Sequence, residues 1–196
     1  MSVVLGLLLA AGAGRRMGAP KALLRDERGE PFLQRSVEAL REGGCDNVLV
    51  VLGAEAEGAA ALLEEGVAVL VAEDWAEGMG ASFRAGLAAA VRTEASCALV
   101  SLVDLPDVGP AVVRRVVEQG GSGPGVLARA AYDGEPGHPV LIGRDHWSGV
   151  TETARGDRGA RDYLAEHPPM LVECGDLATG RDVDTPEHLR QGLHRR

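Results

Sequence analysis

Short apolar runs alternate with amphipathic stretches along most of this chain. Runs with the length of β-strands and few polar residues lie at positions 3–10, 47–53, 67–72, 97–103, 125–130 and 170–173. Stretches with helical periodicity lie at positions 31–42, 54–65, 79–93, 110–119, 160–166 and 186–194. Strands that alternate with helices favour a parallel sheet, and strands that are apolar throughout are typical of a sheet covered on both faces. The pattern therefore predicts an α/β fold with a mostly parallel sheet and helices on both faces.

The composition indicates a single domain over residues 1–196, with a core of valine, leucine and alanine. The net charge of −9 argues against nucleic acid or an acidic membrane as a partner, and 3% aromatic residues supply few platforms for base stacking. Cys45, Cys97 and Cys174 lie far apart in the sequence, which favours buried thiols over disulfides. The first apolar run is too short for a membrane span and lacks the basic flank of a signal peptide. We expect a cytoplasmic protein.

A glycine-rich loop with three cations follows the first apolar run. Residues 9–21 read Leu-Ala-Ala-Gly-Ala-Gly-Arg-Arg-Met-Gly-Ala-Pro-Lys. Small residues let a ligand approach the backbone, and successive N–H groups form a concavity that binds anions. The loop is not a Walker A motif, because Lys21 is followed by Ala22. It matches the dinucleotide fingerprint only weakly and carries more positive charge than such a site needs. Arg15, Arg16 and Lys21 therefore predict a site for phosphates.

Acidic residues follow the central strand and recur near the end of the chain. Asp104 comes directly after the run at 97–103, at the strand end where such sheets bind ligands. One carboxylate together with substrate phosphates is a usual way to hold Mg²⁺. Asp107 lies closer to the next helix and is interpreted as its N-cap. Asp182 and Asp184 lie on one side of an extended segment, so either is a candidate for a second metal ligand, with helix capping as the alternative.

Further glycine-rich segments lie at 78–87, 134–139 and 156–161. In the first, Ser82 and Arg84 are placed to donate to a ligand at a helix N-terminus. The second is interpreted as a turn around His138, and a ligand contact and a structural role are equally consistent with that residue. The third opens a helix and fits either an anion site or a solvated cap. No zinc spacing and no G-x-S-x-G motif is present, so the sequence offers no candidate for a covalent mechanism.

In their order along the chain, these motifs resemble a known family. The segment 9–21 looks like the signature of nucleotidyltransferases with a GT-A-like, Rossmann-like fold. The segments 78–86, 104–106, 137–139, 156–161 and 182–187 are similar to the molybdenum cofactor cytidylyltransferases, the MocA-like branch of the MobA-like nucleotidyltransferase family. The resemblance implies transfer of CMP from CTP to the terminal phosphate of molybdopterin, with Mg²⁺ as cofactor and pyrophosphate as product. Two departures are Leu105, where the family commonly has Gln, and His188, where it usually has an acid.

The resemblance also implies roles for individual residues. Nucleotide contacts are expected from Leu9, Ala10, Ala11, Gly12, Gly14, Arg15, Arg16, Lys21, Gly80, Ser82 and Asp104. Catalytic roles fall to Arg16, Lys21 and Asp104, and the metal ligands are Asp104 and Asp184. The acceptor side is expected to comprise Gly137, His138, Asp157 and Arg158.

Three alternatives stay open at this point. A guanylyltransferase would use GTP on the same cofactor, although its loop typically reads Leu-Ala-Gly-Gly where this chain has Leu-Ala-Ala-Gly. A sugar-phosphate nucleotidyltransferase shares the first motif but is usually longer. A non-catalytic carrier would bind the mature cofactor and pass it on. An enzyme of this kind must also hand over its product, so a transient contact with a recipient molybdenum hydroxylase or its chaperone is expected.

Overall fold

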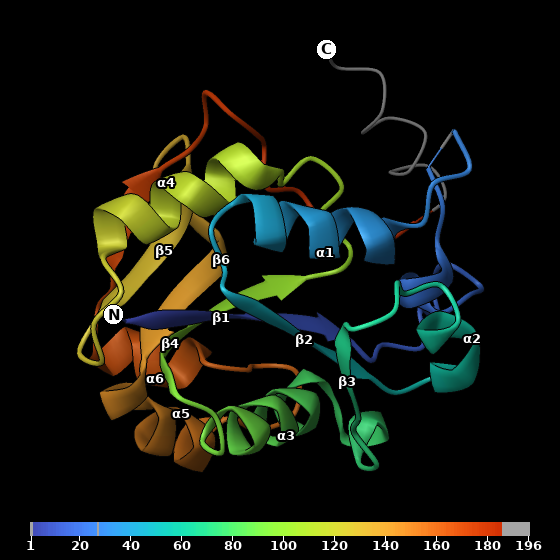
Figure 1. The fold of residues 1–196 in the computed structure, drawn as a ribbon, viewed down its shortest axis with the longest axis horizontal. Helices are drawn as coiled ribbons and strands as arrows, with labels where there is room; N and C mark the ends of the chain where they lie inside the picture. Colours follow the sequence, from blue (N-terminus) through green and yellow to red (C-terminus); the bar gives the residue numbers. More distant parts are fainter. Residues whose placement is uncertain (1, 27, 186–196) are drawn as a thin grey trace.

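The computed structural model describes residues 2–26 and 28–185, in which seven strands form one sheet in the order β3-β2-β1-β4-β6-β5-β7 (Figure 1). The strands are β1 (Val3–Ala10), β2 (Asn47–Leu52), β3 (Ala68–Val71), β4 (Ala95–Leu102), β5 (Leu127–Tyr132), β6 (Glu135–Gly143) and β7 (Met170–Glu173). Strand β6 is antiparallel to its two neighbours, and the remaining pairs are parallel. The mostly parallel sheet expected from the sequence is confirmed.

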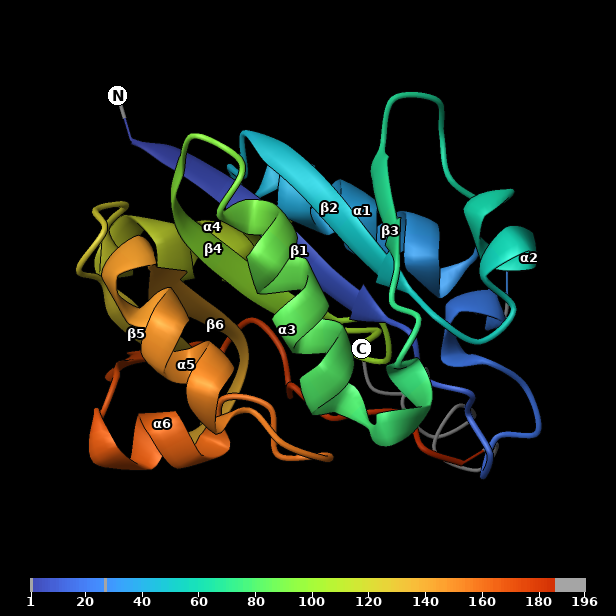
Figure 2. The same cartoon turned by 90° about the horizontal axis from the view of Figure 1, so that it is seen from below.

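Helices cover both faces of this sheet, as expected. They are α1 (Phe32–Glu42), α2 (Ala56–Ala60), α3 (Met79–Ala90), α4 (Pro110–Gly120), α5 (Trp147–Thr153) and α6 (Arg161–Glu166), with 3₁₀ turns η1 (Lys21–Leu23), η2 (Trp75–Glu77) and η3 (Arg144–His146). Helices α1 and α4 lie on one face, and α3, α5 and α6 lie on the other (Figures 1 and 2). Within the described residues, no helix has the length and apolar character of a membrane span.

The structure departs from the sequence pattern in three places. The segment 134–139 was expected to be a turn, but it opens strand β6, because Tyr132 pairs with Glu135 across a tight hairpin. Helix α5 was not expected, and its seven residues are too few to show a clear helical period. The helix expected at 54–65 is only five residues long. The helix expected at 186–194 lies outside the described residues.

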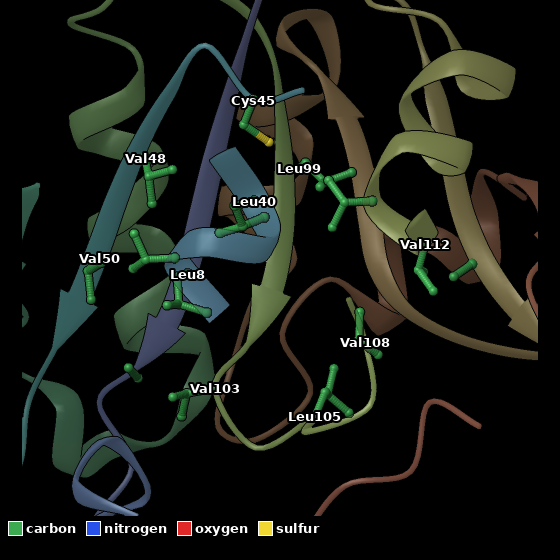
Figure 3. Close-up of a cluster of buried hydrophobic side chains, with 14 of the residues drawn as sticks. Leu8, Leu40, Cys45, Val48, Val50, Leu99, Val103, Leu105, Val108 and Val112 are labelled. Atoms are coloured by element: carbon green, nitrogen blue, oxygen red, sulfur yellow. The ribbon is translucent and has the colours of Figure 1, made fainter. Parts of the chain in front are cut away.

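Side chains at alternating positions of the strands pack into two separate cores, one on each face of the sheet. Leu8 of β1, Val50 of β2 and Leu99 of β4 belong to the core beneath α1 and α4, to which α1 contributes Leu40 (Figure 3). The intervening positions of the same strands, such as Leu7, face α3 and α5. Each central strand is therefore buried on both faces, which explains its unbroken apolar sequence. All three cysteines are buried and free, as expected from the sequence.

Close packing of α3 on the sheet depends on Gly86. A Cβ at this position would lie 2.8 Å from a methyl group of Leu7 and 3.1 Å from one of Val51. We expect Gly86→Val to lower the free energy of unfolding by about 1–3 kcal/mol, because overpacking forces neighbouring side chains from their positions. Ala88→Val is the matched control, since Ala88 is exposed on the same helix. Urea titrations of both variants measure the difference, and equal losses would contradict this packing argument.

Candidate active site

A cleft of about 590 Å³ lies at the carboxyl ends of strands β1 and β4. Its walls come from the loop after β1, the turn η2, the start of α3 and the segments around Asp104 and Asp184. The register pairs Leu9 with Leu102, so the loops that follow the two strands begin side by side. The sheet thereby joins the glycine-rich loop to the acidic residue after β4.

The glycine-rich loop folds back on itself around Gly14. The Gly14 carbonyl accepts hydrogen bonds from the N–H groups of Met17, at 2.8 Å, and Gly18, at 3.0 Å. Gly14 has a φ of +58°, and a Cβ there would overlap the carbonyl oxygen of Ala19. This position therefore requires glycine, and the tight turn directs Lys21 back toward the end of β4.

Asp104 is held in a rigid frame. Its neighbours Val103 and Leu105 are buried in the same core cluster as Val108 (Figure 3). The N–H of Val183 donates to the Asp104 carbonyl oxygen at 2.9 Å, and the Val183 side chain is also buried. The two acids that flank Val183 are thereby fixed beside Asp104.

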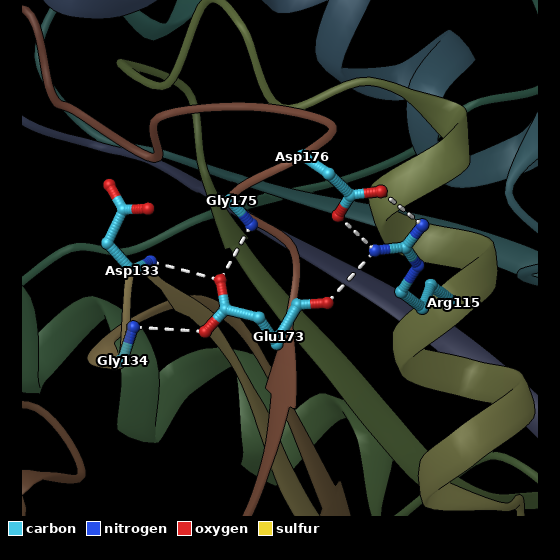
Figure 4. A network of polar contacts seen from close by, with 6 residues as sticks. All are labelled: Arg115, Asp133, Gly134, Glu173, Gly175 and Asp176. Carbon is cyan, nitrogen blue, oxygen red and sulfur yellow. Dashed lines mark hydrogen bonds and ion pairs between the residues drawn. The ribbon is translucent and has the colours of Figure 1, made fainter.

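Polar contacts anchor the segment that carries these acids. After β7, Asp176 pairs with Arg115 of α4, at 2.5 and 2.9 Å (Figure 4). Farther along, a carboxylate oxygen of Asp107 accepts hydrogen bonds from the backbone N–H and the hydroxyl of Thr179, both at 2.6 Å. The interpretation of Asp107 as a helix N-cap is wrong, because Gly109 takes that position. Asp107 instead secures the returning chain.

Glu173 fixes the start of the same segment. Its carboxylate accepts hydrogen bonds from the backbone N–H groups of Gly175, Gly134 and Asp133, at 2.8 to 3.0 Å (Figure 4). These bonds, that of Gly175 foremost, lower the pKa of Glu173. The end of β7 is thereby tied to the turn between β5 and β6.

Three carboxylates and one ammonium group meet at the head of the cleft. Asp104, Asp182 and Asp184 each present an oxygen atom, and these atoms lie within 4.8 Å of one another. Lys21 contacts Asp104 and Asp184, the latter at 2.5 Å, and Arg16 reaches Asp184 at 3.0 Å. Burial alone would lower the pKa of Lys21, but the two carboxylates, Asp104 first, outweigh burial and raise it. Lys21 is therefore a firmly charged counter-ion of the acidic cluster.

The donor set of this cluster fits a hard divalent cation. Carboxylate oxygens are the ligands that Mg²⁺ and Mn²⁺ favour. Oδ1 of Asp104 is buried and has no hydrogen-bond partner among the described residues, which is unusual for a carboxylate. A metal ion would satisfy this atom, with Asp184 or Asp182 supplying the next ligand. The side-by-side placement of Asp182 and Asp184 expected from alternation is confirmed.

The residues expected to contact a nucleotide are mostly brought together here. Those that line the cleft are Leu9, Ala10, Ala11, Gly12, Gly14, Arg15, Arg16, Lys21, Ser82 and Asp104. Gly80 does not line it, because its N–H donates to the Gly156 carbonyl at 2.7 Å and the 155–156 backbone packs against its Cα. Arg84, expected near a ligand, donates to the Ala154 carbonyl at 2.8 Å instead. Trp75 also lines the cleft and was not expected, since nothing in the pattern marks it.

The residues expected on the acceptor side lie around a second, smaller pocket. Its volume is about 120 Å³, and His138, Asp157 and Arg158 line it. Gly137 is not among the lining residues, and its carbonyl accepts hydrogen bonds from Arg129 at 2.9 and 3.1 Å. Asp157 also lines the large cleft, so the two cavities are neighbours. Burial, and secondarily Arg129, lowers the pKa of His138 to about 4.

The low pKa of His138 predicts a pH-dependent stability. The unfolded imidazole binds a proton near pH 6.5 and the folded one near pH 4, so the fold loses stability as the pH falls through this window. Between pH 7.5 and 5 we expect His138 to account for a loss of about 2 kcal/mol, and His138→Asn to abolish that part of the slope. Urea titrations at both pH values measure it. An unchanged slope in the variant would contradict a neutral, largely desolvated imidazole.

Known proteins resemble this chain both in sequence and in structure. The model of the MobA-like NTP transferase domain matches residues 6–170. "Nicotine blue oxidoreductase" of Paenarthrobacter nicotinovorans is 40% identical, over 95% of this chain and 94% of its own. A "Probable molybdenum cofactor guanylyltransferase" of Opitutus terrae is 35% identical, over 84% of this chain and 79% of its own. The crystal structure of Rv0371c in complex with manganese, from Mycobacterium tuberculosis H37Rv, is 28% identical with a TM-score of 0.78, and each chain covers 100% of the other.

Proposed function

The chain belongs to the MobA-like NTP transferase family, and from this premise we propose that it transfers CMP from CTP to the terminal phosphate of molybdopterin, releasing pyrophosphate. One observation carries the proposal: the glycine-rich loop, Lys21 and three carboxylates converge at the head of a cleft that is large enough for a nucleotide. Phosphoryl chemistry depends on this combination of backbone donors, cations and a metal site, and it requires no covalent intermediate.

The reaction assigns a task to each part of the cleft. An oxygen of the acceptor phosphate forms a bond to the α-phosphorus of CTP, while the bond from that phosphorus to the bridging oxygen breaks and its electron pair leaves with pyrophosphate. Backbone N–H groups after β1 hold the triphosphate, and Arg16 and Lys21 donate to the phosphoryl oxygens. Because these donors are fixed by the loop, they stabilise negative charge without rearrangement at the moment of transfer.

The acidic cluster is assigned to Mg²⁺, with Asp104 and Asp184 as protein ligands. Bound there, Mg²⁺ would neutralise phosphate charge and help to orient both substrates. Lys21, which otherwise serves as counter-ion to both carboxylates, then becomes available to the phosphate oxygens. The manganese complex of Rv0371c supports a divalent cation in proteins of this shape.

The preference for CTP rests on the loop after β1. Ala11 is buried in the cleft wall, and its carbonyl accepts the N–H of Ala54 at 3.1 Å. The guanylyltransferase branch typically has glycine at this position, so Ala11 favours the smaller pyrimidine ring. The relative from Opitutus terrae bears a guanylyltransferase name, which makes GTP the first alternative nucleotide.

Pyrophosphate release from CTP, GTP, ATP and UTP tests the proposal, with Mg²⁺ and with or without molybdenum-loaded molybdopterin. We expect release with CTP only when the cofactor is present, and a gain with GTP in the Ala11→Gly variant. A wild-type preference for GTP would retain the metal site and overturn the base assignment. If no nucleotide releases pyrophosphate, transfer to molybdopterin is overturned. The remaining candidates are then transfer to a sugar-phosphate acceptor and a carrier role that needs no turnover.

A second candidate function comes from the relative in Paenarthrobacter nicotinovorans, which is named as an oxidoreductase. Its identity extends over nearly the whole of both chains, so an electron-transfer reaction in the same cleft is tested alongside nucleotidyl transfer. The acidic cluster around Lys21 favours phosphate chemistry, because three converging carboxylates suit a divalent cation that binds phosphates, whereas hydride transfer does not require such a site. Oxidation of NADH or NADPH with nicotine blue as acceptor is the direct assay, and turnover there without pyrophosphate release would favour this second function.

The remaining assignments concern the setting of the reaction. We place it in the cytoplasm, because three free buried thiols fit a reducing compartment. The product is expected to pass to a recipient molybdenum hydroxylase, or its chaperone, through a transient contact. Pull-down of the cofactor-loaded protein with such a hydroxylase, against the cofactor-free protein, tests this step.

A further inference from the structure

An arginine, Arg129, lies on a mostly apolar sheet face, where His138 is its polar neighbour in the wall of the small pocket. Along β5, Ala128 and Ala130 face the core beneath α4, so the alternation of strand positions directs Arg129 to the opposite face. There it stands beside its cross-strand partner Val140, which belongs to the second core. A cation at an inward-facing strand position is costly unless a partner compensates its charge.

No carboxylate supplies that partner within the described part of the chain. The guanidinium of Arg129 donates from two nitrogen atoms to the Gly137 carbonyl, which is a neutral acceptor. Burial, followed by the positive charge of nearby Arg161, lowers the pKa of Arg129. The positive charge of Arg129 therefore has a second positive charge beside it, that of Arg161, and a neutral carbonyl as its hydrogen-bond partner.

The small pocket gathers this positive charge next to the nucleotide cleft. Its walls hold Arg129, Arg158 and Arg161, against the single carboxylate of Asp157. Arg158 is already paired with Asp162 on the surface, which leaves Arg129 and Arg161 as the cations facing the pocket. In a protein with a net charge of −9, this concentration of cations points to an anionic ligand.

The shape of the pocket limits what the anion is. At about 120 Å³ it is much smaller than the cleft and accommodates one compact group rather than a nucleotide. Phe83 and Leu164 form part of its wall, and an apolar wall strengthens hydrogen bonds from guanidinium to oxyanion. Leu9 and Met79 line both cavities, so a group bound here belongs to a molecule that also reaches the cleft.

We propose that this pocket, where it adjoins the cleft, binds the terminal phosphate monoester of the acceptor substrate, the group whose oxygen attacks CTP, through Arg129 and Arg161. A planar guanidinium presents paired donors that match phosphate oxygens, and the bound anion offsets the buried charge. This inference rests on the proposed function for the identity of the acceptor, but phosphate binding itself requires no turnover. It therefore has a test of its own.

Calorimetric titration with inorganic phosphate supplies that test. The wild-type protein is expected to bind phosphate at two sites, one in the cleft and one in the small pocket. Arg129→Gln is expected to weaken one site by about ten- to a hundredfold, which is the scale of losing charged hydrogen bonds, while Lys21→Met weakens the other. Arg129→Lys retains the charge and is expected to keep most of the affinity. Unchanged phosphate binding in Arg129→Gln would overturn the proposal.

A matched control separates binding from a structural role. Arg144 also clamps backbone carbonyls, those of Ala95 and Thr93 at 2.7 and 2.9 Å, but it lines neither cavity. Arg144→Gln is expected to retain both phosphate sites. If both glutamine variants lose phosphate binding in proportion to their loss of stability, Arg129 is structural and the proposal is overturned.

Kinetics connect the pocket to the acceptor. With an active nucleotide, Arg129→Gln is expected to raise the acceptor KM about tenfold or more while the nucleotide KM changes less than about twofold. Parallel increases in both constants would contradict an acceptor site. If no nucleotide supports turnover but phosphate binding still depends on Arg129, the transfer reaction fails and the anion site stands.

Discussion

Replacing Asp104 by asparagine is expected to lower the rate of nucleotidyl transfer by about a hundred- to a thousandfold, the scale of losing one preorganised electrostatic group. The substitution retains the shape of the side chain and the backbone bond from Val183, so the frame of the site survives. It removes the charge that would hold a divalent cation and leaves a neutral amide, a weaker ligand, at the buried Oδ1 position. Steady-state rates at saturating substrates measure the loss.

Two comparisons sharpen this result. Asp145→Asn is the control, because Asp145 is exposed on the turn η3 and lies outside the cleft. Asp182→Asn and Asp184→Asn, tested side by side, reveal which acid is the second ligand, since that variant alone should require more Mg²⁺ for half-maximal rate. An Asp104→Asn enzyme with the activity of the control would contradict a metal site at this cluster.

Much of the fold was predictable because its central strands are buried on both faces. After its exposed first residue, Asn47, strand β2 is buried and apolar at every position, so its apolar run stands out in the sequence. Strand β6 was not predicted because Pro136, Gly137 and Pro139 interrupt its first half, and such residues are typical of turns. Its pairing is specified by the neighbouring strands β4 and β5 rather than by local propensity.

The candidate site was predictable to the extent that local motifs encode it. Position in the sequence was enough to place Asp104 at a strand end and the glycine-rich loop before Lys21. The pairing of Lys21 with two carboxylates was not predictable, because these residues are up to 163 positions apart and meet only through the anchored segment after β7. The sheet face that Arg129 occupies was not predictable either, because it depends on where β5 lies within the sheet.

Lys21→Met is expected to make the stability of the protein depend on Mg²⁺. Lys21 is the counter-ion of Asp104 and Asp184, and its side chain is only 19% exposed. Without it, the buried Asp104 carboxylate loses the ammonium group that balances its charge, and we expect unfolding to require about 1–3 kcal/mol less, below the 3–5 kcal/mol of a fully buried pair. Millimolar Mg²⁺ should restore much of this loss, because a divalent cation replaces the missing charge and stabilises the folded state by mass action.

Stability and activity should then separate in this variant. Mg²⁺ restores the fold of Lys21→Met but not the rate, because the ammonium that would donate to phosphate oxygens is gone and transfer stays about a hundredfold or more slower. Arg16→Met is the matched control for stability: its pair with Asp184 involves a side chain that is 76% exposed, so its unfolding free energy should change by less than about 1 kcal/mol. Thermal unfolding with and without Mg²⁺, beside the rate with CTP, measures both effects. Full recovery of the rate with Mg²⁺ would assign Lys21 to charge balance alone, and a Tm indifferent to Mg²⁺ would show that the three carboxylates do not bind it.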